Sequence, residues 1–500
     1  MISAVLLLAH GGLGLLALGS AWVPVPWRGR VLVSLCVLGA GFGIALVVMN
    51  GSLEEWRAVE LSGVATVAGA AIAAAWLVAA VVAAPEGRAL SCALVGIACS
   101  SMALAVMSEW VVPALLFWLC SSLALAGLAS HARSGPWVWV VLFASDAALV
   151  AALFGNWVDT RSWVLPDALE GWTFYVLVAA VALRAGVVPL FGTWSLLGRA
   201  SPAIPLLVGG SFCILRVALG DGDPWAGSVL FVAALAVALV VLFARRPWGG
   251  IGAAAAAPIA TMLGLAVIAP ASISAAGTAA VVTAAVAALW LASSEEGAPD
   301  RVVALVALPP SLGFIAAAIA VVAALANTVA ADDTVDTVSW TLALVLGPLA
   351  LTASLAVATR LAATLPAAPG WFGRLRTRQQ SAYAVLIVRL LLALSIAGAI
   401  LPGDWLGIQA GVAAWDERRA ILFGTAIVLA AAAAWFAARR TVPAPTRARP
   451  ASFRASAWVD SPPTGTIAAR ALTAASLLLV VGAIGVVGWL TFEGLRLGFL

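Results

Sequence analysis

The feature that most constrains this chain is a succession of long apolar runs separated by short polar segments. About sixteen of these runs reach the roughly 20 residues that an α-helix needs to cross the hydrocarbon core of a bilayer. Of the 500 residues, 64% are hydrophobic and 10% are charged, whereas a typical soluble domain has about 25% charged residues. This pattern excludes a soluble globular protein. It predicts an all-α polytopic membrane protein with about 14–16 transmembrane helices.

The predicted spans also suggest how the chain is organised. We place them at residues 2–22, 30–50, 62–84, 89–107, 110–131, 136–156, 171–190, 202–220, 224–244, 249–269, 272–293, 302–330, 337–362, 380–402, 416–438 and 466–490. The first run has no basic segment and no obvious cleavage site, so we expect it to be retained as a span. We divide the chain into N-terminal helices (1–88), a core (89–330), C-terminal helices (331–438), a linker (439–465) and a terminal helix (466–500).

The distribution of arginine predicts the orientation of the chain in the membrane. Most of the arginines between spans lie in loops that follow odd-numbered spans, whereas loops after even-numbered spans hold only Arg57, Arg161, Arg418 and Arg419. Positively charged loops tend to remain in the cytoplasm. Both termini are therefore predicted to lie outside it. The linker at 439–465 is rich in Pro, Arg and Ala, which is typical of a basic cytoplasmic segment without a folded core.

Residues 181–220 contain a break between two apolar helices. The first apolar segment carries Arg184 and runs to Pro189, and a second segment begins after Pro202 and Pro205. Non-helical backbone at membrane depth is tolerated only where protein or a water-filled cavity satisfies its polar groups. The pattern therefore predicts a discontinuous membrane helix that lines a transport path.

This break resembles the broken seventh helix of the antiporter-like subunits shared by respiratory complex I, membrane hydrogenases and Mrp-type cation/proton antiporters. In that family a lysine precedes a Pro-Leu-His turn, a tryptophan follows, and a Thr-Pro pair opens the next helix. The residues at the corresponding positions are Arg184, Pro189-Leu190-Phe191, Trp194 and Ser201-Pro202. The resemblance implies an antiporter-like core of two inverted five-helix repeats, each of which contributes one broken helix.

Two further segments carry the resemblance. Residues 308–314, Leu-Pro-Pro-Ser-Leu-Gly-Phe, resemble the family's second broken helix and include Pro309, Pro310 and Gly313. The two breaks lie five predicted spans apart, in agreement with the family's plan. The third segment, Phe117-Trp118-Leu119, is similar to the family's Trp-Glu-Leu pattern.

The ionisable groups of the family are missing or changed at these matched positions. Leu119 stands where the family has a glutamate, and Ala317 and Arg184 stand where it has lysines; the whole chain contains no lysine. A lysine in a dry helix can release its proton, whereas arginine stays charged in essentially any protein setting. Arg184 therefore cannot carry protons as the family's lysine is held to do. It can act as a fixed charge that tunes a path, binds an anion or pairs with an acid.

Few other ionisable residues lie inside the apolar runs, and such residues are candidates for function because a charge in lipid is costly. Asp146 lies in the middle of the span before that of Arg184, so the two can form a structural pair or line a hydrated path. Arg216, near a span end, is expected to reach the membrane interface. Arg389 lies deeper and fits either a charged position of the last antiporter helices or a contact with a partner subunit. His10 is interpreted as a hydrogen-bonded core residue.

The remaining residues whose side chains could take part in catalysis or ligand binding form no recognisable site. The five cysteines lie in apolar runs without metal-ligand spacing or a disulfide framework, so we interpret them as small buried hydrophobes. The tryptophans mostly lie near span ends, as in an aromatic belt. No catalytic triad, metal cluster or phosphate-binding loop emerges. We therefore expect no catalytic residues, cofactor or bound nucleic acid.

Together these observations predict a non-redox, antiporter-like membrane subunit of a proton- or sodium-translocating assembly of the complex I type, similar to an NADH-quinone oxidoreductase. Its own ion path is expected to be altered or lost. Two alternatives remain open: a membrane subunit of a two-component inorganic-carbon (bicarbonate or CO2) transporter, and a structural scaffold. In each case the expected partners are other membrane subunits and the lipid bilayer, and the expected location is a bacterial inner membrane.

Overall fold

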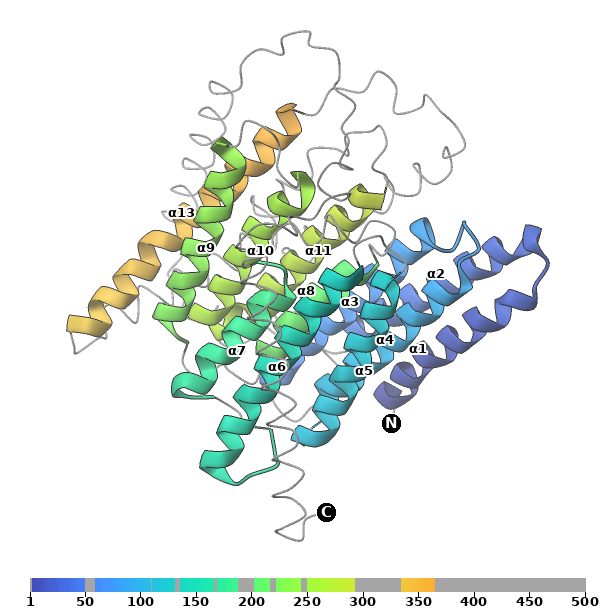
Figure 1. Cartoon of the computed structure of the whole chain (residues 1–500), viewed down its shortest axis with the longest axis horizontal. Helices are drawn as coiled ribbons and strands as arrows, with labels where there is room; N and C mark the ends of the chain where they lie inside the picture. Colours follow the sequence, from blue (N-terminus) through green and yellow to red (C-terminus); the bar gives the residue numbers. More distant parts are fainter. Residues whose placement is uncertain are drawn as a thin grey trace.

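The computed structural model describes residues 2–49, 59–108, 110–130, 135–165, 169–187, 202–215, 222–243, 250–292 and 334–364. Within these ranges the chain is almost entirely α-helical, and one isolated bridge joins Trp110 to Val164. The helices are α1 (Ile2–Gly19), α2 (Val25–Met49), α3 (Val59–Val82), α4 (Ala89–Met107), α5 (Val111–Ser130), α6 (Gly135–Thr160), α7 (Gly171–Arg184), α8 (Ala203–Leu215), α9 (Pro224–Phe243), α10 (Gly250–Ile268), α11 (Ile273–Ala292) and α13 (Thr334–Thr364). Figure 1 shows them as one inclined bundle.

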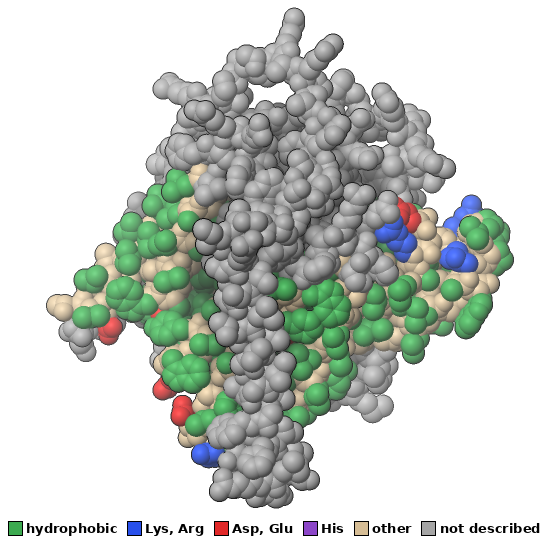
Figure 2. All heavy atoms as spheres, in the orientation of Figure 1, with side chains coloured by type: hydrophobic (Ala, Val, Ile, Leu, Met, Phe, Trp, Pro, Cys, Tyr) green, Lys and Arg blue, Asp and Glu red, His purple; other side chains and the backbone are tan. Residues whose placement is uncertain are grey.

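Six of the described helices, α2 to α6 and α13, contain stretches long and apolar enough to cross a membrane. Large apolar side chains point outward on the bundle surface; Leu16, Val37 and Leu116 are examples. Figure 2 shows that the described side chains on the face drawn are mainly hydrophobic, with the few charged ones near helix ends. These properties confirm the prediction of an all-α polytopic membrane protein.

The centre of the bundle is formed by α3, α8 and α11, which contact one another. Every residue of α8 is buried. On one side of this centre α1 packs on α4, α4 on α5, α5 on α6 and α6 on α7; on the other side α10, α9 and α13 pack in succession (Figure 1). Because α7 also contacts α8, the two helices that flank the predicted break pack against each other; α8 is buried, whereas α7 keeps an exposed face that includes Trp172 and Tyr175.

Most of the predicted spans within the described residues agree with the observed helices to within a few residues, but the seventh is shorter than expected. The spans predicted at 302–330, 380–402, 416–438 and 466–490 lie outside the described residues. The seventh span was expected to continue to residue 190, whereas α7 ends at Arg184. The reason is Gly186, whose φ of +71° takes the backbone into the left-handed region. The helix therefore stops before Pro189, which lies outside the described residues.

Small residues allow two helices to approach closely at the edge of the bundle. A Cβ atom on Gly96 of α4 would lie 2.7 Å from the Cα of Gly14 and 2.7 Å from the carbonyl oxygen of His10, both in α1. These neighbours are backbone atoms, so a side chain can be fitted only if the helices move apart. Close approach at small residues is a common way for membrane helices to associate.

We predict that Gly96→Ala destabilises the packing of α1 against α4 by about 1–3 kcal/mol, because the added methyl group overpacks this contact. The measurement is the thermal unfolding midpoint of the detergent-purified protein. The matched control is Gly12→Ala in α1, where an added Cβ meets nothing within 4 Å. Equal midpoints for the two variants would contradict the packing described here.

Candidate functional site: a buried ion pair

The site begins at the point where α7 ends. The amide of Gly186 donates to the carbonyl of Leu183, and the amide of Val187 donates to the carbonyl of Ala182. Together with the left-handed glycine, these two hydrogen bonds form a Schellman motif, which is a common helix ending. Arg184 is therefore the last helical residue of α7. The C-terminal end of a helix carries a partial negative charge that favours a cation at this position.

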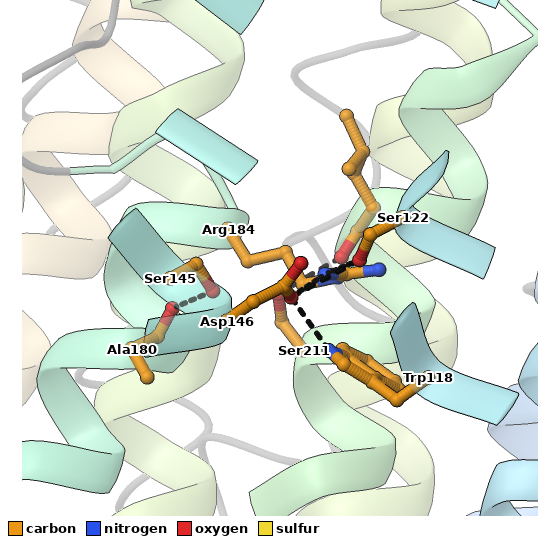
Figure 3. Close-up of polar contacts among 8 residues, drawn as sticks. Trp118, Ser122, Ser145, Asp146, Ala180, Arg184 and Ser211 are labelled. Carbon is orange, nitrogen blue, oxygen red and sulfur yellow. Dashed lines mark hydrogen bonds and ion pairs between the residues drawn. The ribbon is translucent and has the colours of Figure 1, made fainter. Parts of the chain in front are cut away.

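Arg184 is buried, with 2% of its surface exposed, and its guanidinium meets a carboxylate from the neighbouring helix. Its Nη1 atom lies 2.9 Å from Oδ1 of Asp146, which is also buried. Asp146 lies near the middle of the 26-residue helix α6. The ion pair that the sequence made possible is thus present (Figure 3), and both of its side chains are buried.

Helix α5 completes the polar cluster with two side chains one helical turn apart. The Trp118 indole Nε1 donates to Asp146 Oδ1 at 2.9 Å, and the Ser122 hydroxyl donates to the same oxygen at 3.0 Å. Ser122 Oγ also accepts a hydrogen bond from Arg184 Nη1 at 2.9 Å. Residues four apart lie on one face of a helix, so α5 presents both groups to the ion pair.

The guanidinium is also covered by an aromatic ring. Its Cζ atom lies 3.8 Å from the centroid of the Trp118 ring, within the range of a cation–π interaction, which is strongest when the cation is desolvated. One oxygen of Asp146 thus accepts three hydrogen bonds while the ring shields Arg184 from one side. Hydrogen bonds to a charged group are stronger than neutral ones. They help to offset the cost of removing both charges from water.

The pair still has unused hydrogen-bonding capacity. Within the described structure, Oδ2 of Asp146 and Nε of Arg184 are buried and have no hydrogen-bond partner. Buried polar atoms are nearly always paired, so each such atom needs a specific reason. Oδ2 of Asp146 is able to accept a hydrogen bond, and the Nε–H group of Arg184 is able to donate one.

The surrounding helices hold these residues in place. The Ser145 hydroxyl donates to the carbonyl of Ala180 at 2.8 Å and so joins α6 to α7 next to the pair. From α8, Gly210 faces the indole of Trp118, and a Cβ on this glycine would lie 3.0 Å from the ring. Ser211, drawn with the cluster in Figure 3, is fully buried and donates to the carbonyl of Leu207 in its own helix.

The other residues selected from the sequence are only partly covered by the structure. Pro202 directly precedes α8, and Pro205 lies in its first turn, where a helix tolerates the missing amide hydrogen. The remaining ones, Pro189, Arg216, Pro309, Pro310, Gly313 and Arg389, lie outside the described residues. Among the residues that the structure describes, no three His, Cys, Asp or Glu side chains are placed to hold a metal ion.

His10 and the cysteines were assigned structural roles from the sequence, with one error. His10 is fully buried, and its Nδ1 accepts a hydrogen bond from Nε1 of Trp76 at 3.2 Å, which confirms a hydrogen-bonded core residue. Cys36 and Cys92 are buried and face each other with 3.8 Å between their sulfur atoms. The interpretation of all five cysteines as buried was wrong for Cys120, which is exposed, because α5 is an outer helix with one face outside the bundle.

Sequence reasoning did not identify two of the four residues of the site. Trp118 was noted only for its place in a motif, and Ser122 was not singled out. The available signal was their spacing, which places a tryptophan and a serine on one face in the middle of an apolar helix. Leu119, where the resemblance puts a glutamate, is only partly buried. The carboxylate that pairs with Arg184 comes from α6 instead.

Comparisons with known proteins identify the fold. No family model matches the chain, and neither does any curated protein. A chain in the structure of respiratory complex I from Thermus thermophilus with bound aureothin superposes with a TM-score of 0.58 at 17% identity, over 80% of this chain and 98% of that chain. A chain in the structure of the Mrp complex from Dietzia sp. DQ12-45-1b gives a TM-score of 0.57 at 16% identity, over 86% and 100%.

Both matches extend over nearly the whole length of the known chain. The chain thus has the fold of an antiporter-like membrane subunit. The resemblance that the sequence motifs indicated is confirmed at this level.

We predict that Asp146→Ala destabilises the protein by about 3–5 kcal/mol, because removing one partner of a buried pair leaves the other charge uncompensated. The control is Asp159→Asn, which changes an exposed acid at the end of the same helix. The midpoint of thermal unfolding in detergent or nanodiscs measures both. If Asp146→Ala were as stable as the control, Arg184 would have to be satisfied by another partner.

Proposed function

We propose that this chain is a non-redox, antiporter-like subunit of a multi-subunit membrane assembly that translocates protons or sodium ions, and that its own ion path runs past a fixed positive charge. One observation carries the proposal. A buried Arg184–Asp146 pair lies at the end of α7, in a fold shared with chains of a complex I and an Mrp complex. Buried charges in membrane proteins most often mark ion pathways or their regulation.

The chemistry of arginine limits what this site can do. Because its guanidinium does not release a proton under physiological conditions, Arg184 does not relay protons itself. It sets the electrostatic potential of the path and holds Asp146 in place. Oδ2 of Asp146 supplies an acceptor to water or a cation that passes the pair, and Nε of Arg184 supplies a donor to water.

The second candidate function is a membrane scaffold that holds partner subunits without moving ions. The observation in its favour is the loss of the family's ionisable residues at Leu119 and Ala317, together with the replacement of its lysine by Arg184. The same geometry is expected if the Arg184–Asp146 pair only stabilises the bundle. Neither of the two similar structures is of an inorganic-carbon transporter, so that alternative gains no support from them.

Ion flux after replacement of Arg184 distinguishes the two functions. The assembly is purified through a tag on this chain and reconstituted in proteoliposomes, where proton and sodium flux are recorded. We predict that Arg184→Gln abolishes the flux, because the fixed charge is lost. We predict that Arg184→Lys keeps part of the flux with a changed pH dependence, because a lysine in a dry site can titrate.

Two controls accompany this experiment. Arg30→Gln removes an exposed arginine of α2 and is expected to leave the flux unchanged. Recovery of the partner subunits with each variant shows whether the assembly is intact. Normal flux and normal assembly for Arg184→Gln would contradict the ion path and favour the scaffold.

A further inference from the structure

A small apolar cavity lies beside the ion pair. It has a volume of about 50 Å³ and is lined by the last turn of α4, the first turns of α5, the second half of α6, Leu165 and the end of α8. All of its lining residues are apolar. One water molecule needs roughly 10–15 Å³ and two or more polar partners, so this cavity has room for water but does not favour it.

Trp118 is shared by the cavity wall and the polar cluster. Its ring lies over the guanidinium of Arg184 at 3.8 Å, its Nε1 donates to Asp146, and the residue also lines the cavity. Among the described residues of these two sets, no other belongs to both. The indole thus stands between a half-open apolar pocket and two buried charges.

The position of the indole is fixed from several directions. The hydrogen bond to Asp146 orients the ring, and Gly210 of α8 lies at its edge, where an added Cβ would be 3.0 Å from the ring. Trp118 itself is buried. Moving the ring requires the loss of one charge-assisted hydrogen bond and of the cation–π contact. The ring therefore keeps the cavity apart from the Asp146–Arg184 pair until another group binds Asp146.

We propose that Trp118 is a gate that separates this cavity from the Asp146–Arg184 pair and thereby controls the access of water and small cations to the pair. Apolar constrictions are known to close membrane pathways by excluding water. When the ring moves away, the cavity gains the oxygen of Asp146 as a polar wall, and water then has the partners it needs. A cation that attracts Asp146 would displace the indole from its acceptor and open the gate.

The geometry also assigns a side to the gate. The cavity lies toward the connections from α4 to α5 and from α6 to α7, because it is lined by the ends of α4 and α8, the start of α5 and Leu165. The arginine distribution predicts that these connections face away from the cytoplasm. The role of Trp118 in ion movement rests on the proposed function, whereas its role as a partition does not.

The test is the accessibility of a cysteine placed beside the pair. Ser211→Cys is introduced into the full-length protein after the five native cysteines have been replaced by alanine; Ser211 is fully buried and adjoins Gly210. The probe is 2-aminoethyl methanethiosulfonate, added from the side of the cavity. Unreacted thiol is counted by mass spectrometry. With Trp118 present, the thiol is expected to stay protected.

Three variants of this reporter protein distinguish an open gate from a general loosening of the packing as the cause of faster labelling. Trp118→Ala is expected to raise the labelling rate by about tenfold or more, because the cavity and the pair then form one hydrated space. Trp118→Phe keeps a ring over the guanidinium but loses the hydrogen bond to Asp146, so its labelling rate is expected to lie between those of the parent and Trp118→Ala. Leu153→Ala is the matched control, because it enlarges the cavity but leaves Trp118 unchanged. Its labelling rate is expected to stay near that of the parent. If Trp118→Ala does not fold, Trp118→Leu gives an intermediate increase.

Unchanged labelling of Trp118→Ala overturns the gate, and so does equal labelling of Trp118→Ala and Leu153→Ala. Passive proton leak through proteoliposomes, measured on the same variants without the reporter cysteine, provides a separate readout. Increased labelling with increased leak supports both the gate and the ion path. Increased labelling without leak, when the parent assembly also moves no ions, supports the partition and contradicts the proposed function.

Discussion

The structure depends on the compensation of one buried positive charge. Arg184 lies at 2% exposure in the interior of an apolar bundle, where an isolated charge is not tolerated. Asp146 supplies the opposite charge from α6, and Trp118 and Ser122 supply hydrogen bonds from α5. Three consecutive helices are thereby fixed around one carboxylate oxygen. The pair determines how this part of the bundle packs.

The position of the cation follows from the way α7 ends. A left-handed glycine two residues after Arg184 stops the helix inside the bundle, and the helix end favours a positive charge there. The next described helix starts at residue 203. Where a helix ends at membrane depth, its polar backbone groups are tolerated only next to protein or a hydrated space. The backbone conformation at Gly186 therefore places the charged side chain of Arg184 in the interior of the bundle.

The sequence was sufficient for the architecture and for half of the site. Apolar runs of membrane length predicted most helices closely, because burial in lipid leaves few alternatives to a helix. Asp146 and Arg184 were found because charges are rare in such runs. Trp118 and Ser122 were not, because tryptophan and serine are common in membrane helices and only the packing of α5 against α6 and α7 shows their role. The early end of α7 was also missed, since the effect of Gly186 depends on its φ angle and not on its identity alone.

The central claim is that Asp146 and Arg184 act as one coupled unit. A double-mutant cycle measures this directly, with the free energy of unfolding determined for the parent protein, Asp146→Ala, Arg184→Ala and the double variant. The predicted result is that the double variant loses less stability than the two single losses combined, with a coupling energy of about 1–3 kcal/mol. Additive losses would show that the two charges do not stabilise each other, and would contradict the account of the site.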